Sequence, residues 1–129
     1  MQIEHVALWT RDLERSRAFY VTYFDGLAGD KYTNTRTGFE SYFLHFEDGA
    51  RLELMQMPGI VDNSNSPEQQ SLGWIHVAFK AGSREAVDAL TARLRGEGYR
   101  IVGEPRVTGD GYYESVALDP DGNRVEIVA

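Results

Sequence analysis

The stretch "DGARLEL", residues 48–54, recurs as "DGNRVEI" at residues 121–127. Asp-Gly, Arg, Glu and the flanking aliphatic residues match at a constant offset of 73 residues. Asp-Gly is a strong signal for a turn between two strands. The alternation of aliphatic and charged residues after the turn predicts a strand with one buried face. The repeat therefore predicts a duplicated unit whose last strand is this stretch.

A second repeat marks the first strand of each unit. "EHVAL" at 4–8 and "IHVAF" at 75–79 share His-Val-Ala followed by a large apolar residue. Strand-like runs are also predicted at 29–34, 40–47 and 50–57 in the first half, and at 99–104, 112–118 and 123–128 in the second.

A helical pattern lies between the first strand and the other three strands of each unit. The first helix is predicted over 12–24, with Asp12 as its N-cap and Gly26 as its stop. The second is predicted over 83–98, with Ser83 as its N-cap and Gly96 or Gly98 at its end.

Each half is therefore predicted to run strand–helix–strand–strand–strand. We expect residues 1–57 to form the first βαβββ module and residues 72–129 the second, joined by a connector over 58–71 that is rich in Pro, Asn, Ser and Gln. One helix covers only one face of such a sheet, so the other face must be closed by the second module. The expected fold class is α+β: two βαβββ modules in tandem, together one domain, forming an open barrel-like sheet around a cleft.

Composition excludes several classes of protein and site. The chain has 129 residues and no cysteine, which excludes disulfides, thiolate metal sites and a cysteine nucleophile. Its net charge of −7 argues against nucleic acid as a partner. No apolar run approaches the roughly 20 residues of a membrane span, and the N-terminus lacks the features of a signal peptide. We therefore expect a cytoplasmic protein with no membrane partner.

Strand alternation places four side chains on one predicted surface. Alternate residues of a strand face the same side. Their aliphatic neighbours suit the side of the sheet that the helix covers. The four residues left on the inner surface are His5, Glu53, His76 and Glu126.

Two imidazoles and two carboxylates form a suitable ligand set for a divalent ion such as Zn, Ni, Co, Mn or Fe(II). In the alternative interpretation, the histidines are hydrogen-bonded core residues and the glutamates are exposed strand residues. His45 is a weaker candidate that is expected to be packed or at the surface. Arg51 and Arg124 flank the two glutamates, and either support the ligands or lie on the surface.

Four stretches resemble the vicinal oxygen chelate superfamily, which is also called the glyoxalase/bleomycin resistance/dioxygenase family. They are "IEHVALWTRDLERSRAFYVTYFDGL" at 3–27, "ARLELM" at 50–55, "WIHVAF" at 74–79 and "ALDPDGNRVEIV" at 117–128. The resemblance implies paired βαβββ modules whose metal ligands lie on the first and last strands of each module, here His5, Glu53, His76 and Glu126. The complete His/Glu/His/Glu set is similar to that of glyoxalase I. Extradiol dioxygenases use two histidines and one glutamate.

The resemblance implies a metal-dependent, glyoxalase-like lyase or isomerase that acts on a small substrate with adjacent oxygens through a metal-stabilised enediolate. Glu53 or Glu126 is the expected catalytic base. The first half lacks the extended glutathione-contacting sequence of glyoxalase I, which favours another small oxygenated substrate. Two alternatives stay open. One is an Fe(II) dioxygenase in which Glu53 does not bind the metal, and the other is a non-catalytic protein that binds an antibiotic or a metabolite.

The expected assembly is a homodimer, because a two-fold interface needs only one self-complementary surface. The modules could pair within one chain or between two chains, and the sequence leaves both arrangements open.

Overall fold

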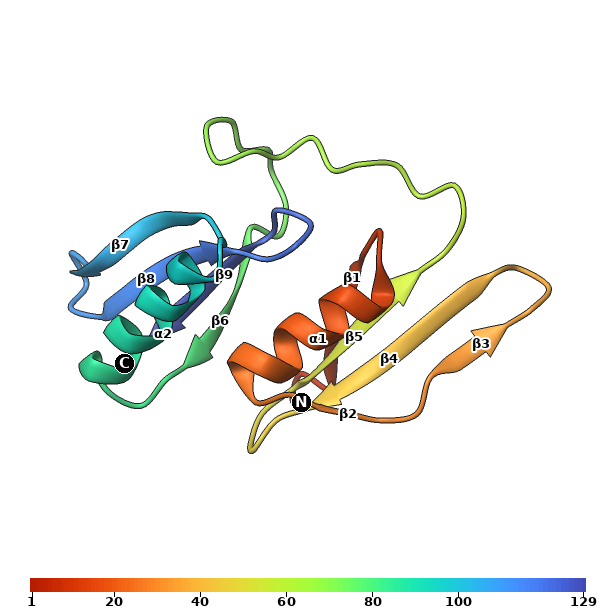
Figure 1. The fold of residues 1–129 in the computed structure, drawn as a ribbon, viewed down its shortest axis with the longest axis horizontal. Coiled ribbons are helices and arrows are strands. Elements are labelled where there is room, and N and C mark those ends of the chain that lie inside the picture. The colour runs from red at the N-terminus through yellow and green to blue at the C-terminus, as the bar shows by residue number, and fades with distance from the viewer. The chain divides into compact units, whose positions relative to one another are not determined.

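The computed structural model describes all 129 residues. The chain divides into two compact units, unit 1 (Met1–Asp62) and unit 2 (Asn63–Ala129). Each unit has one helix on one face of an open sheet, and neither sheet closes into a barrel (Figure 1). The predicted α+β class and the two βαβββ modules are confirmed.

Unit 1 contains β1 (His5–Trp9), α1 (Leu13–Phe24), β2 (Leu27–Ala28), β3 (Tyr32–Asn34), β4 (Phe39–His45) and β5 (Arg51–Gln56). The sheet order is β1-β5-β4-β2, and β3 also pairs with β4. The first and last strands, β1 and β5, are parallel neighbours. The strand predicted over 29–34 is confirmed only in part: β3 covers Tyr32–Asn34, and residues 29–31 lie between β2 and β3. Ala28 pairs with Leu44 and Tyr32 pairs with Ser41, so the register against β4 shifts by one residue across this break.

Unit 2 contains β6 (His76–Lys80), α2 (Arg84–Gly96), β7 (Ile101–Val107), β8 (Tyr113–Leu118) and β9 (Arg124–Val128). The sheet order is β6-β9-β8-β7, and β6 and β9 are again parallel neighbours. The register of β7 against β8 shifts between Gly103 and Arg106. Pro105 lies within this irregular stretch. It has no N–H to donate, so an edge strand such as β7 is the part of a sheet that tolerates it.

Both helices begin at the predicted caps. The Asp12 carboxylate accepts a hydrogen bond from the Arg15 N–H at 3.0 Å. The Ser83 hydroxyl accepts one from the Ala86 N–H at 3.1 Å. Each cap satisfies one of the N–H groups that the first turn of a helix leaves without an intrahelical partner.

The predicted helix ends agree with the structure less closely than the predicted helix starts. α1 ends at Phe24, and Asp25, not the predicted Gly26, adopts the left-handed conformation with φ of 55°. Aspartate is one of the few residues other than glycine that adopt this conformation with any frequency. α2 ends at Gly96 as predicted, and Gly98 has φ of 92°.

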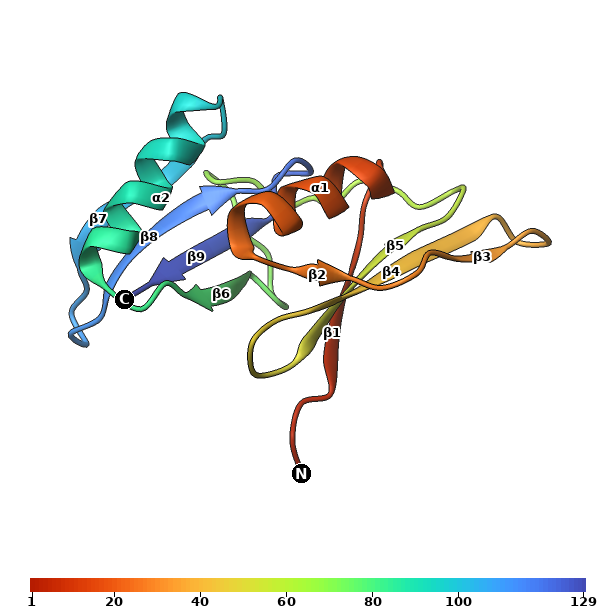
Figure 2. The ribbon, with the colours of Figure 1, turned by 60° about the horizontal axis from the view of Figure 1, so that its bottom comes forward.

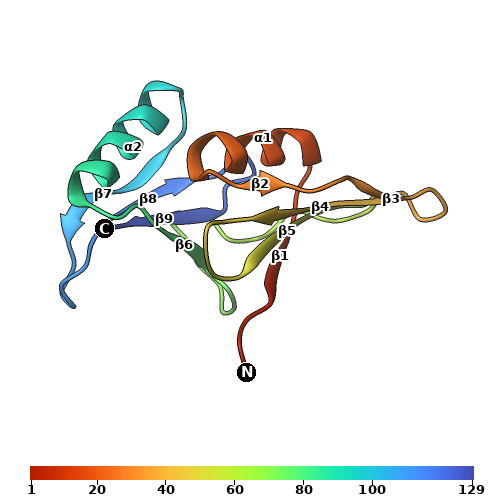
Figure 3. The same ribbon diagram turned by 90° about the horizontal axis from the view of Figure 1, so that it is seen from below.

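The two cores are built alike. In unit 1, α1 packs against β4 and β5, and in unit 2, α2 packs against β7, β8 and β9. In Figures 2 and 3, each helix lies across one face of its own sheet. We call the opposite side of each sheet its helix-free face. Each core consists of apolar side chains from the helix and from the strands that it covers. Those that are fully or almost fully buried are Leu13, Phe19, Tyr20, Leu44, Leu52 and Leu54 in unit 1, and Val87, Leu94, Ala117, Val125 and Ile127 in unit 2.

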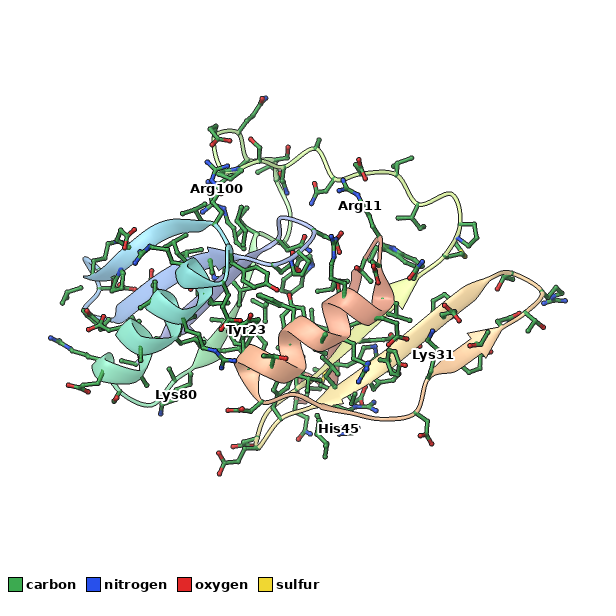
Figure 4. All side chains as sticks on the ribbon, viewed as in Figure 1. Arg11, Tyr23, Lys31, His45, Lys80 and Arg100 are labelled. Atoms are coloured by element: carbon green, nitrogen blue, oxygen red, sulfur yellow. The ribbon has the colours of Figure 1, made fainter.

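Two arginines form ion pairs with the connector. The Arg11 guanidinium donates to the Asp62 carboxylate at 2.8 Å, within unit 1. The Arg100 guanidinium donates to the Glu68 carboxylate at 2.6 Å, within unit 2. Figure 4 labels both arginines. Neither helix of the chain is long and apolar enough to span a membrane.

We predict that Leu94→Ala lowers the free energy of unfolding by about 2–5 kcal/mol, because it leaves a cavity under α2. Leu72→Ala is the matched control, since Leu72 is fully exposed, and should change it by less than about 0.5 kcal/mol. Urea denaturation followed by circular dichroism measures both values. Equal losses in the two variants would contradict the described core.

Candidate functional site

The first candidate pair is His5 and Glu53, on neighbouring strands of unit 1. Leu52 and Leu54 are buried on the α1 side of β5, so Glu53 points to the helix-free face. His5 lies on the same face of β1, and its Nε2 atom is 3.9 Å from Oε2 of Glu53. The Glu53 side chain is only 14% exposed and that of His5 41%.

The surroundings of His5 orient its ring. The Glu4 carboxylate contacts Nδ1 of His5 and also the Arg51 guanidinium. The Phe43 ring meets the imidazole edge to face at 5.4 Å, and Arg51 lies over Phe43 at 4.3 Å. A carboxylate on Nδ1 favours the tautomer that leaves the lone pair on Nε2, the atom nearer Glu53. Of the two predicted roles for Arg51, support of the histidine therefore agrees better with its contacts.

The second candidate pair is His76 and Glu126, at the equivalent strand positions of unit 2, although here Nδ1 of the histidine, not Nε2, is the nitrogen nearer the carboxylate. Val125 and Ile127 are buried under α2, and Glu126 points to the helix-free face. Nδ1 of His76 lies 3.3 Å from Oε1 of Glu126, and the two side chains are 39% and 18% exposed. Arg124 differs from its repeat partner, because its guanidinium donates to the Pro67 carbonyl at 3.1 Å.

The strand registers show why both units form the same pair. In unit 1, Ala7 lies opposite Glu53. In unit 2, Ala78 lies opposite Glu126. In both cases the histidine is two residues earlier on the strand, on the same face, and a small alanine beside the glutamate leaves room for the two side chains to approach.

Partial burial affects the pKa of Glu126. Removal from water raises the pKa of the Glu126 carboxyl above its usual value, and the neighbouring His76 opposes this rise. The Glu114 carboxylate raises the same pKa further, whereas the Arg106 guanidinium lowers it. Glu126 therefore lies among charges of both signs on the helix-free face of unit 2.

The donor chemistry of each pair suits a divalent ion. Donors about 2.0–2.2 Å from one tetrahedral zinc ion are about 3.3–3.6 Å apart, close to the separation in the His76 pair and slightly less than that in the His5 pair. The structure contains no group of three or more histidine, aspartate or glutamate side chains placed to hold a metal. Each unit thus supplies two of the four predicted ligands.

Two charged neighbours of Glu126 were not predicted from the sequence. Glu114 and Arg106 form an ion pair at 3.4 Å on the helix-free face of unit 2. The alternation in "YESVAL", residues 113–118, was a usable signal for Glu114, since it places Glu114 on the same face as Val116, which lies opposite Glu126. Arg106 had no such signal, because the register shift in β7 breaks the alternation.

Comparison with known proteins gives one curated relative of almost the same length. The chain is 31% identical over 132 residues to a protein of Bacillus subtilis (strain 168) named "Uncharacterized protein YqjT", and the match covers 98% of each protein.

Two solved structures have the same fold. A glyoxalase family protein from Enterococcus faecalis matches with a TM-score of 0.80 at 23% identity, over 99% of this chain and 97% of the other. Glyoxalase I from Zea mays, as its V278E mutant, matches with a TM-score of 0.80 at 23% identity, over 98% of this chain and 44% of the maize chain. These similarities establish the fold.

The family comparison covers nearly the whole sequence. Residues 2–127 match the model of the Glyoxalase/Bleomycin resistance protein/Dioxygenase superfamily. The match includes both repeats and both His–Glu pairs. The chain belongs to the Glyoxalase/Bleomycin resistance protein/Dioxygenase superfamily.

Proposed function

We propose that this protein is a metal-dependent lyase or isomerase of the glyoxalase I type that acts on a small substrate with two adjacent oxygens. In this proposal His5, Glu53, His76 and Glu126 hold one divalent ion. The observation that carries the proposal is the repetition of one His–Glu pair, in one register and on one face, in both units.

The charges of the four ligands suit this role. Two carboxylates balance the double charge of the ion, and two neutral imidazoles complete a four-coordinate set. The ion, when bound, supplies Lewis acidity that stabilises negative charge on the substrate oxygens. The contact of Glu4 with Nδ1 holds His5 in a fixed orientation before any ligand arrives.

The glutamates have a second role in this proposal. Glu53 or Glu126 accepts the proton from the substrate carbon beside the carbonyl, and the same carboxyl then returns it to the adjacent carbon. Proton transfer to a positioned carboxylate typically contributes about 10²–10⁴-fold to the rate. Both side chains are mostly buried, which limits the amount of water around the carboxylates.

We predict one divalent ion for each complete set of four ligands, and its loss in His76→Ala. His45→Ala is the matched control, because His45, labelled in Figure 4, is an exposed histidine at the end of β4. Elemental analysis of purified protein measures the metal content. The metal site is refuted if His76→Ala keeps its full metal content or if His45→Ala loses its metal.

We predict that substitution of the catalytic base, by Glu53→Gln or Glu126→Gln, slows exchange of the substrate C–H proton with solvent by about 10²–10⁴-fold. The reason is that an amide keeps the shape of the side chain but cannot accept the proton. The assay follows deuterium incorporation into hydroxyacetone in D₂O by NMR, with zinc-loaded protein. Glu47→Gln, a substitution outside both pairs, is the control. Unchanged exchange in both ligand variants, with their metal retained, would remove the acid–base role.

We also propose that the protein is a homodimer. The strands that carry the histidines, β1 and β6, are both sheet edges, whose outer N–H and C=O groups a partner could pair or cover. The modules then pair either within each chain or between the two chains. In the second case each metal site takes His5 and Glu53 from one protomer and His76 and Glu126 from its partner.

Light scattering across a dilution series should give the mass of a dimer, and a monomer at every concentration would refute the dimer. A mixed dimer then separates the two pairings. His5→Ala chains and His76→Ala chains are given different affinity tags, and dimers carrying both tags are purified. Pairing between chains restores one complete metal site in each mixed dimer, whereas pairing within chains restores none. Metal content distinguishes the two results.

A further inference from the structure

The two units share their His–Glu pairs but differ in the next row of side chains. Going across the sheet of unit 1 on the helix-free face, the row beyond Glu53 consists of Trp9, Met55, Ser41 and Tyr32. The corresponding row of unit 2 consists of Lys80, Val128, Glu114 and Arg106. The fold therefore does not require charge at this position. Unit 2 alone has two cations and one anion there, and Figure 4 labels Lys80 at the end of β6.

The Arg106 guanidinium extends from its own row of the sheet toward the neighbouring row, which contains Glu126. A Cβ atom at Gly103 would lie 3.3 Å from a terminal nitrogen of Arg106 and 3.1 Å from the Val116 side chain. Gly103 pairs with Val116, which pairs with Glu126, so these three residues form one row across the sheet. The missing side chain at Gly103 and the register shift of β7 together make room for the guanidinium in that row.

The Arg106 guanidinium has one ion-pair partner and keeps further donors available. Its one ion pair, with Glu114 at 3.4 Å, uses part of its capacity, and the Arg106 side chain is 51% exposed. An arginine has five N–H donors. Gly103 and Glu126 are two strands apart, a backbone separation of about 9–10 Å. A short carbon chain of a substrate spans this distance, from substrate oxygens near Glu126 to a second group at the Arg106 guanidinium.

We propose that Arg106 binds a carboxylate of the substrate, which determines specificity for small carboxylate-bearing molecules with two adjacent oxygens. This inference rests on the proposed function. The row of Lys80, Glu114 and Arg106 carries one net positive charge, which matches a single carboxylate better than a doubly charged phosphate. The planar guanidinium also matches the two oxygens of a carboxylate. The competing explanation is an ion pair between Arg106 and Glu114 that only supports the sheet.

Two chelators that differ in one group test the proposal on zinc-loaded protein. Succinic monohydroxamate carries a chelating pair of oxygens and, two carbons away, a carboxylate. Butanohydroxamate has a methyl group in place of that carboxylate. We expect the wild type to bind the carboxylate form about 10–100-fold more tightly by isothermal titration calorimetry, the range for a hydrogen bond to a charged group.

Three variants assign this preference to the guanidinium. Arg106→Gln should abolish it. Gly103→Ala, which keeps every charge but places a Cβ against the guanidinium, should reduce it. Arg95→Gln is the matched control, because Arg95 forms an ion pair with Glu104 at 2.5 Å elsewhere in unit 2, and it should keep the preference.

The outcomes distinguish a failure of the carboxylate site from a failure of the proposed metal function. Equal affinity of the wild type for both chelators, or a preference that survives Arg106→Gln, overturns the carboxylate site and leaves chelation intact. Binding of neither chelator overturns the proposed metal function. In that case, titration of metal-free protein with succinate tests the carboxylate site by itself. A saturable shift of the Arg106 side-chain N–H signal in NMR spectra supports the site, and no shift overturns it.

Discussion

The pleat of β5 and β9 is the constraint on which the candidate site depends. Leu52 and Leu54 must be buried under α1, and Val125 and Ile127 under α2, since burial of each aliphatic side chain contributes about 1.5–3 kcal/mol. The residue between two buried neighbours on a strand must face the opposite side. Hydrophobic burial therefore fixes the direction in which Glu53 and Glu126 point. The energy that folds each sheet also places one carboxylate on its helix-free face.

Parallel pairing of the first and last strands extends this constraint to the histidines. β1 lies beside β5, and β6 beside β9, although the helix and the other strands separate them in the chain. The crossover through the helix makes this parallel pairing possible. The registers set Ala7 against Glu53 and Ala78 against Glu126, and thereby bring each histidine within 4 Å of its glutamate.

The sequence predicted those parts of the fold that depend on local pattern. The caps Asp12 and Ser83 and the alternation around Glu53 and Glu126 are local signals, and the structure has each of them where the pattern placed it. The break between β2 and β3 was not predicted, because it comes with a one-residue shift of register against β4, and the pattern of a single strand does not show such a shift. The position of Arg106 was hidden for a similar reason, since a register shift is a property of two strands together.

The two units share one set of candidate site residues and differ in another. The His–Glu pairs are the same in both units, as a shared metal set would require. The adjacent rows differ, with Trp9 and Tyr32 in unit 1 and Lys80 and Arg106 in unit 2. Within the proposed function, the shared residues supply the chemistry and the divergent residues select the substrate. Duplication followed by divergence of one row is a simple route to a new specificity on an unchanged metal site.

X-ray absorption spectroscopy of zinc-loaded protein tests the central claim most directly, because outer-shell scattering counts the imidazoles bound to the ion. The account predicts two imidazole nitrogens and two carboxylate oxygens at about 2.0–2.2 Å. His5→Ala and His76→Ala should each reduce the imidazole count to one. A spectrum with no imidazole, or with a count that neither substitution changes, would contradict the convergence of the two His–Glu pairs on one metal.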